Sequence, residues 1–401
     1  MSTDTASVIH GVDQRRLRRI ADAIAPYEQR GALPDWAFQV SRRGQIVTSL
    51  TGSGQTGSPP APADAIYRIY SMTKPITSVA AMMLYERGSL DLNAPVSAYI
   101  PSFADLRVYL GGPATAPVTH PAARPMLVKH LLTHTSGLTY GFHRTHVTDE
   151  IYRLAGYEFN PADKDLATAC DAFAAMPLRF EPGTSWLYSV ATDVLGRVVE
   201  VASGRSLDSF FADEILTPLG MHDTAFHAVD PSRLATLHLH TPEGARILQT
   251  FGPDPSTTPV FLSGGGGLYS TMADYQRFAD FLLGGGAVDG VRLLSSRTVD
   301  FMATNHLPGD ADLDEFGIPL YAETPFTGVG FGLGFAVTMD PVATGIASSP
   351  GEFGWGGLAS TYFWIDPVED LTAIFMTQLI PSSALPIRPL LKQVTYAALV
   401  D

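Results

Sequence analysis

Polar and apolar residues alternate in the first part of the chain as they do in paired strands. Residues 36–40 and 45–50 alternate on either side of Arg43-Gly44, which predicts a β-hairpin. A charged amphipathic helix is expected to begin after Asp13. The stretch from Gly52 to Pro62 is rich in glycine, proline and alanine and predicts a loop.

The strand pattern returns near the C-terminus. Residues 331–339, 360–365 and 371–376 are rich in aromatic and β-branched side chains and predict three strands, with a turn that opens at Asp366-Pro367. A last helix is expected from about Pro386 to Leu399. Because strands lie at both ends of the chain, we expect one sheet built from the two termini.

The middle of the chain has a different pattern. In residues 91–220 proline is frequent, alternation is scarce, and short helical repeats recur, as in Val194, Leu195, Val198 and Val199. This favours a mainly helical domain inserted into a sheet domain formed by residues 1–90 and 221–401. The predicted fold class is therefore α+β, an antiparallel β-sheet flanked by helices plus a mainly helical inserted domain.

A run of glycines, Gly264–Gly267, follows the predicted insertion. It lacks P-loop spacing and indicates close backbone packing or a loop near a cleft. Thr271 is expected to cap the next helix through its hydroxyl. Asp274, the third residue of that helix, is expected to complete a capping box by bonding back to Thr271.

A serine and a lysine stand three residues apart at the predicted start of another helix, in Ser71-Met72-Thr73-Lys74. Residues 65–70 predict a short strand before it, and apolar residues recur at helical spacing after it as far as Gly88. Positions three apart share a helix face, so the Lys74 amine can reach the Ser71 hydroxyl. A desolvated lysine can take the proton that makes a serine nucleophilic.

Two further segments supply what a serine–lysine pair needs. Tyr188 lies just before a predicted helix and could exchange protons with Ser71, because a nearby ammonium would favour the tyrosine anion. Leu358 follows Trp355-Gly356-Gly357, where glycines allow close backbone approach. Its amide could join that of Ser71, at a helix start, in holding an oxyanion.

Composition narrows the classes of function. The chain has 401 residues, 45% of them hydrophobic and 16% charged, which indicates a globular protein. Its formal net charge of -14 argues against nucleic acid as a partner. Cys170 is the single cysteine, so no internal disulfide forms, and we expect it to be buried.

No apolar run is long enough to cross a membrane, and the N-terminal segment has no signal-type apolar core. We therefore expect a soluble cytoplasmic protein. The sequence leaves self-association open.

Other catalytic and metal motifs are weaker. His130 and His134 have the spacing of a helical metal pair but lack the glutamate of H-E-x-x-H, and His238 and His240 have no acidic cluster beside them. Structural roles are favoured for these histidines. No G-x-S-x-G segment occurs, which argues against an α/β-hydrolase with a Ser-His-Asp triad.

Three segments in this order, Ser71-Met72-Thr73-Lys74, Tyr188-Ser189-Val190 and Trp355-Gly356-Gly357, resemble the motifs of the serine β-lactamase and penicillin-binding-protein superfamily. Within it, the chain is most similar to the class C β-lactamase-related family VIII carboxylesterases. The segment from His130 to Leu138 and Glu181-Pro182-Gly183 add support, and the resemblance spans nearly the whole chain. It implies a β-lactamase/transpeptidase-like fold.

The resemblance also implies roles for individual residues. Ser71 forms the acyl-enzyme, Lys74 and Tyr188 together act as general base and then acid, and the amides of Ser71 and Leu358 form the oxyanion hole. Which of Lys74 and Tyr188 accepts the first proton stays open. No metal and no organic cofactor is implied.

Two departures from the superfamily pattern bear on the substrate. Val190 stands where penicillin-recognising members carry asparagine, and Trp355-Gly356-Gly357 stands where they carry Lys-Thr-Gly. The second change removes a cation and a hydroxyl that would meet a carboxylate. We expect Val190, Trp355, Gly356 and Gly357 to bind substrate, and a serine carboxylesterase that hydrolyses small, uncharged short-chain or aryl esters.

Three alternatives remain open. An acyltransferase or transesterase would use the same residues with an alcohol in place of water. A β-lactamase or D-amino-acid peptidase-type amidase would need polar groups for a charged substrate. A non-catalytic binding protein on the same fold is the third, and the intact Ser71, Lys74 and Tyr188 argue against it.

Overall fold

A seven-stranded antiparallel sheet forms the centre of the computed structural model, which describes residues 8–54 and 61–401. Both ends of the chain contribute to it, as the sequence predicted, and the α+β class is confirmed. In order across the sheet, the strands are β13 (Val329–Phe331), β14 (Ala336–Thr338), β15 (Phe353–Gly356), β16 (Tyr362–Asp366), β17 (Leu371–Thr377), β3 (Trp36–Arg42) and β4 (Gln45–Gly52).

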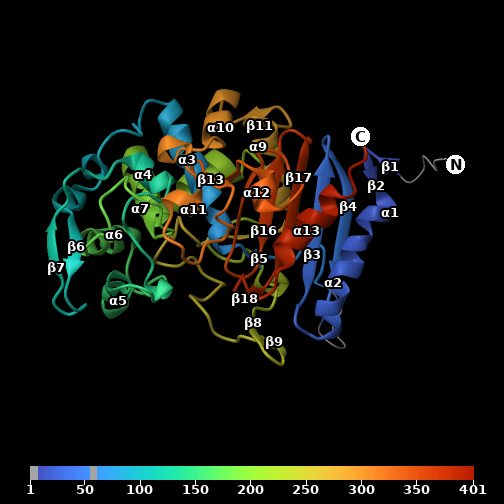
Figure 1. The fold of residues 1–401 in the computed structure, drawn as a ribbon, viewed down its shortest axis with the longest axis horizontal. Helices are drawn as coiled ribbons and strands as arrows, with labels where there is room; N and C mark the ends of the chain where they lie inside the picture. The colour runs from blue at the N-terminus through green and yellow to red at the C-terminus, as the bar shows by residue number, and fades with distance from the viewer. Residues whose placement is uncertain (1–7, 55–60) are drawn as a thin grey trace.

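Helices cover both faces of this sheet (Figure 1). One face packs against helices from the two termini, α1 (Gln14–Leu17), α2 (Arg19–Gln29) and α13 (Ile387–Tyr396). The other packs against α9 (Met272–Leu283), with α3 (Thr73–Glu86) in the same core. Successive side chains of a strand point to opposite faces, so Trp364 enters one core and Phe363 the other.

Helices dominate residues 91–220, which lie beside the sheet at the left of Figure 1. They are α4 (Val128–Leu132), α5 (Val147–Leu154), α6 (Leu166–Ala175), α7 (Ala191–Ser203) and α8 (Leu207–Phe211). A hairpin of β6 (Arg107–Gly111) and β7 (Val118–Pro121), which the sequence pattern did not predict, projects from this part. Cys170 is buried in α6, as expected.

Short elements complete the described chain. The helices are α10 (Ser296–Met302), α11 (Leu313–Phe316) and α12 (Pro341–Thr344), and the strand pairs are β1 (Val8–Ile9) with β2 (Val12–Asp13), β5 (Tyr67–Arg68) with β10 (Tyr269–Ser270), and β11 (Ala287–Val288) with β12 (Val291–Arg292). A small three-stranded sheet joins β8 (His238–Thr241), β9 (Gly244–Ile247) and β18 (Leu379–Ile380).

The structure corrects two predicted strands. Residues 331–339 do not form one strand: Phe331 ends β13, and Ala336–Thr338 form β14. The chain turns between them at Gly334, which has a φ of +97° and no room for a side chain beside Ser78. The strand predicted for residues 65–70 is only Tyr67–Arg68. Of the predicted loop from Gly52 to Pro62, residues 55–60 lie outside the described residues.

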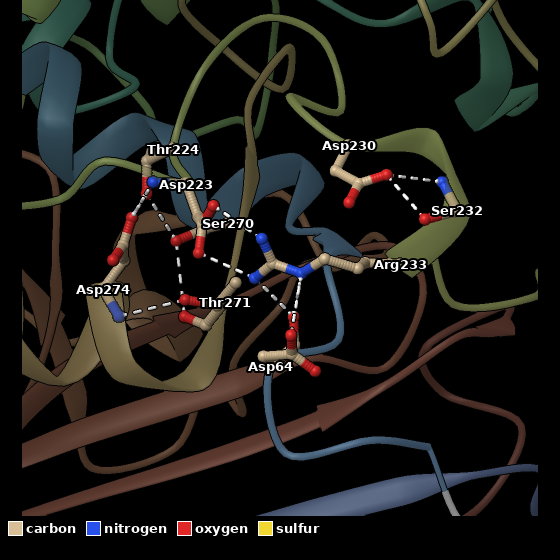
Figure 2. Close-up of polar contacts among 9 residues, drawn as sticks. All are labelled: Asp64, Asp223, Thr224, Asp230, Ser232, Arg233, Ser270, Thr271 and Asp274. Carbon is tan, nitrogen blue, oxygen red and sulfur yellow. Dashed lines mark hydrogen bonds and ion pairs between the residues drawn. The ribbon is translucent and has the colours of Figure 1, made fainter.

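A polar network ties the segment before β5 to the start of α9, as Figure 2 shows. Arg233 donates to the backbone oxygen of Asp64 and to both carboxylate oxygens of Asp223. The Thr271 hydroxyl caps α9 by accepting from the Asp274 amide at 3.2 Å, as predicted.

The carboxylate of Asp274 does not return a bond to Thr271, which corrects the expected capping box. It accepts instead from the Asp223 amide and the Thr224 hydroxyl, each at 2.8 Å. The network therefore closes on the neighbouring segment rather than on the helix itself.

Candidate active site

Ser71 and Lys74 lie next to one another at the start of α3. Ser71 belongs to a 3-10 turn, Tyr70–Met72, that leads directly into the helix, and Lys74 is the second residue of the helix. Both side chains are buried, and Lys74 Nζ lies 3.3 Å from Ser71 Oγ. The spacing of three residues therefore brings the Lys74 amine to the Ser71 hydroxyl, as the sequence predicted, although Ser71 precedes the α-helix proper.

Tyr70, directly before the serine, has a φ of +42°. Residues other than glycine rarely adopt this backbone conformation. Such backbone strain concentrates at functional sites. The turn ends the strand after Arg68 and sets both Tyr70 and Ser71 at the wall of one cavity.

Tyr188 reaches the same point from the other part of the chain. It lies just before α7, is 1% exposed, and donates a hydrogen bond from its hydroxyl to Ser71 Oγ at 2.6 Å. Residues 117 positions apart in the sequence thus meet at one oxygen atom. The structure brings together all three side chains for which we predicted catalytic roles.

Lys74 has two further partners that the sequence did not reveal. Its Nζ donates to the backbone oxygen of Gly265 at 2.6 Å and to the Tyr140 hydroxyl at 3.0 Å. The glycine run from Gly264 to Gly267 indicates close packing in the sequence, but the sequence does not show that Lys74 is the residue bonded there. Tyr140 carried no signal, because it lies outside the three motifs and its neighbours in sequence show no periodic pattern.

Asp193 holds the glycine segment in place. Its carboxylate accepts from the Ser263 hydroxyl at 2.6 Å and from the Gly265 amide at 3.0 Å. A side chain at Gly265 would lie 2.8 Å from Asp193 Oδ2, so only glycine fits there.

Burial decides the protonation of the two groups beside Ser71. It lowers the pKa of the Lys74 amine to about 8, although the charges of Asp193 and Glu323 act in the opposite direction. It raises the pKa of the Tyr188 phenol well above its usual value, and the charge of Glu323 raises it further. The hydrogen bond to Ser71 only partly offsets this rise.

The expectation that a nearby ammonium favours the Tyr188 anion is therefore wrong. The phenol is neutral and donates its proton to Ser71 Oγ, whereas a substantial fraction of Lys74 is neutral near pH 8. With two N–H groups donated to Gly265 and Tyr140, the lone pair of a neutral Lys74 is free to accept the Ser71 proton.

The predicted oxyanion donors face the same cavity. Leu358 lies in the turn after β15 and lines the cavity together with Ser71. Within residues 8–54 and 61–401, neither the Ser71 amide nor the Leu358 amide donates to another protein group. Their role in holding an oxyanion stays a prediction.

The predicted substrate-binding residues separate into two groups. Val190 lines the cavity, whereas Trp355, Gly356 and Gly357 are buried and do not. The Trp355 ring lies behind Tyr188, with the two ring centroids 5.4 Å apart. Trp355 therefore supports the tyrosine, and its predicted role as a wall for substrate gains no support.

The two glycines make room for neighbouring groups instead. A side chain at Gly356 would lie 2.5 Å from the guanidinium carbon of Arg388, and one at Gly357 would lie 2.4 Å from the Ile69 oxygen. Arg388 donates to the backbone oxygens of Gly357 and Thr361, both at 3.0 Å, and so holds the turn that carries Leu358.

The cavity has a volume of about 510 Å³, within the usual range for small-molecule sites. Its lining is rich in aromatic side chains, which include Phe142, Phe159, Phe251 and Tyr269 as well as Tyr188. It can therefore hold an apolar group of moderate size against Ser71.

The histidines of the sequence motifs have structural partners. The His134 ring packs on Tyr188 with centroids 5.1 Å apart, and the His130 side chain bonds the Leu127 amide at 3.1 Å. In the part of the chain that the structure describes, no group of three His, Cys, Asp or Glu side chains is arranged to hold a metal ion. No helix in that part is long and apolar enough to span a membrane.

Comparisons with known proteins agree with this fold. A model of the Beta-lactamase family matches residues 20–393. A protein of Mycobacterium tuberculosis is 37% identical over 328 residues, which cover 80% of this chain and 79% of that one. Esterase EstB of Burkholderia gladioli is 30% identical over 399 residues, which cover 94% and 92%.

Among solved structures, EstCE1, described as a hydrolase with promiscuous acyltransferase activity, matches with a TM-score of 0.78. The match covers 96% of this chain and 98% of that one. Because the identity is 22%, this match supports the fold alone.

Proposed function

The chain belongs to the Beta-lactamase family, and from that premise we propose that it is a serine carboxylesterase of the family VIII type, with Ser71 of the S-x-x-K motif as nucleophile. The observation that carries the proposal is the chain of contacts from Tyr188 through Ser71 to Lys74 at the wall of the aromatic cavity. The 30% identity to esterase EstB over nearly the whole length supports it.

In the first half of the reaction, Lys74 is the base. Its lowered pKa supplies a neutral amine near pH 8, which accepts the Ser71 proton as Oγ attacks the ester carbonyl. The amides of Ser71 and Leu358 would stabilise the resulting oxyanion. Tyr188 then gives its proton to the departing alkoxide, and the Lys74 ammonium restores the proton of Tyr188 through the hydroxyl network.

In the second half, water replaces the alcohol. The same groups remove a proton from the water molecule as it attacks the acyl-enzyme, and Ser71 leaves with that proton while the acid departs. No step of this scheme requires a metal ion or an organic cofactor.

The cavity supports short-chain or aryl esters as substrates. Its aromatic lining favours apolar acyl or aryl groups, and its volume limits their size. The division into a sheet domain of residues 1–90 and 221–401 and a domain of residues 91–220 fits this scheme, since the first would supply Ser71 and Lys74 and the second Tyr188.

Acyl transfer to an alcohol is a second candidate function. The same residues would serve, and the fold neighbour EstCE1 is described as having such activity. The ratio of transfer to hydrolysis with added alcohols in an ester assay separates the two outcomes.

A labelling experiment tests the proposal. A serine-directed phosphonate and a panel of 4-nitrophenyl esters should each add their mass to the intact protein, on the peptide that contains Ser71. Ser71→Ala should lose the adduct and at least about 10⁴-fold in kcat/KM. The proposal fails if the adduct forms on another residue or if Ser71→Ala retains ester turnover.

A further inference from the structure

Arg68 lines the same cavity as Ser71, three residues before it in the chain. Its neighbours Tyr67 and Ile69 point into the core, so the alternation of the strand turns Arg68 towards the cavity. The buried Gln378 side chain bonds both the amide and the carbonyl of Arg68 at 3.1 Å. The backbone that carries this guanidinium is therefore fixed.

Arg68 has no acidic partner among the described residues. Its guanidinium donates a long bond, 3.3 Å, to the Ala235 oxygen, and it also has a side-chain hydrogen bond with the Tyr269 phenol. Among the described residues that line the cavity, it is the only cation. Many other arginines among the described residues are held in ion pairs, as Arg233 is with Asp223, whereas the half-buried Arg68 has no acid to neutralise it.

The carboxylates at the cavity wall are engaged elsewhere. Glu323 pairs with Arg388 at 2.7 Å, Glu158 accepts from Arg144, and Asp193 is held by Ser263 and the Gly265 amide. Asp254, near Tyr269, accepts from the Ser256 amide and hydroxyl. None of these acids neutralises Arg68.

Two phenols line the same cavity as this guanidinium. The Tyr70 hydroxyl is buried and has no hydrogen-bond partner among the described residues. Tyr269 is the cross-strand partner of Arg68, so the two side chains share one face, and the Arg68 guanidinium lies 5.7 Å from the Tyr269 ring centroid. The charge of Arg68 acts to lower the pKa of both phenols, against the larger effect of burial, which raises it.

We propose that Arg68, with the hydroxyls of Tyr70 and Tyr269, forms a subsite for a carboxylate carried by the ester substrate. A guanidinium without an acidic partner and an unpartnered buried hydroxyl can both donate to a carboxylate, and charge-assisted bonds are the stronger polar ones. The inference rests on the proposed esterase function. It replaces the expectation of uncharged esters with one of esters that carry an acidic group away from the reacting carbonyl.

Two matched pairs of esters test the subsite on either side of the ester bond. Mono-4-nitrophenyl adipate against 4-nitrophenyl hexanoate places the carboxylate on the acyl side. 4-(Butyryloxy)benzoate against 4-(butyryloxy)benzamide places it on the alcohol side. In the wild-type protein, the charged member of one pair should have a KM about tenfold lower than the neutral member.

Variants assign this preference to the residues. Arg68→Gln should remove the preference, Arg68→Lys should keep part of it, and Tyr70→Phe should weaken it several-fold. Arg246→Gln is the matched control, because it removes the same charge from an exposed site and should leave the ratio of KM values unchanged. Thermal melting and phosphonate labelling of Ser71 establish that each variant is folded.

Equal KM values within both pairs for the wild-type protein would overturn the subsite, as would an Arg68→Gln variant that slows charged and neutral esters alike. Loss of the preference in Arg246→Gln would assign it to net charge and overturn the subsite too. If no ester is hydrolysed and the phosphonate leaves Ser71 unlabelled, the esterase function itself fails and the subsite falls with it.

Discussion

Two sets of side chains around the active-site cavity are built on different principles. In one set, which we call the catalytic corner, the polar atoms of Ser71, Lys74 and Tyr188 are buried and bonded to one another. In the other set, which we call the aromatic wall, Phe142, Phe159 and Phe251 present carbon surface to the cavity. Phe159 is 51% exposed there, whereas Tyr188 is 1% exposed.

The difference shows that reaction and selectivity are separable in this protein. Low exposure in the corner shifts the pKa values of Lys74 and Tyr188 apart, which is what an acid and a base require. The wall contributes contact area and shape without any titrating group. Changes in the corner should therefore affect all esters alike, and changes in the wall should affect only some.

Tyr188→Phe should produce the largest effect of the changes that leave Ser71 intact. It removes the hydroxyl that bonds Ser71 Oγ but keeps the ring between His134 and Trp355, so kcat should fall about 10² to 10⁴-fold for every ester. Steady-state kinetics on short and bulky esters measures this.

Tyr157→Phe is the matched control for the loss of a phenol. Tyr157 also lines the cavity, but its hydroxyl bonds neither Ser71 nor Lys74. Its removal should leave kcat within a few-fold of the parent. Equal kcat values for Tyr188→Phe and the parent would remove Tyr188 from the proton path.

The catalytic corner could be predicted from the sequence because its members stand in short, ordered segments. Helix geometry alone places Lys74 beside Ser71, and Tyr188 marks the second segment. Tyr140 and Asp193 could not be predicted in this way. Tyr140 contacts Lys74, and Asp193 contacts Gly265, only through tertiary packing of distant segments. No local sequence pattern encodes such contacts.

The prediction of strands from the sequence also succeeds for local patterns and fails where tertiary contacts decide. The hairpin of β3 and β4 follows from alternation around Arg43-Gly44, since both strands are local. Residues 331–339 have the composition of one strand, but tertiary contact at Gly334 folds them into two. Trp355 was expected in the cavity, and only the register of β15 on β16 shows that it packs behind Tyr188.

The pH dependence of kcat/KM should show a rising limb near pH 8. Lys74 acts as the neutral amine, and burial lowers its pKa to about 8, so below that pH protonation should reduce kcat/KM about tenfold per unit. Above it the rate should level off, because the raised pKa of Tyr188 keeps the phenol protonated. A stopped-flow profile from pH 5 to 10 with a neutral ester measures the limb.

Asp193→Asn tests whether Lys74 is the group that titrates in this pH profile. The Asp193 carboxylate raises the pKa of Lys74 by favouring the ammonium, so removing its charge should move the rising limb to lower pH. The amide keeps the size of the side chain near Ser263 and Gly265. A limb that stays at the same pH would mean that a group other than Lys74 titrates there.

Phe159→Ala should give the smallest effect and confine it to the wall. Phe159 stacks on Phe142 with ring centroids 6.1 Å apart and meets Phe251 edge-on at 5.3 Å, yet half of it is exposed. Its truncation should raise KM for naphthyl esters about three- to tenfold, through lost contact with the bound ring, whereas both kinetic parameters for a small acetate ester should stay within about twofold of the parent. Val342→Ala, at an exposed position outside the cavity lining, is the control for loss of an apolar side chain. A fall in kcat for the acetate ester in Phe159→Ala would show that the wall also positions the catalytic corner, and the separation of reaction from selectivity would not hold.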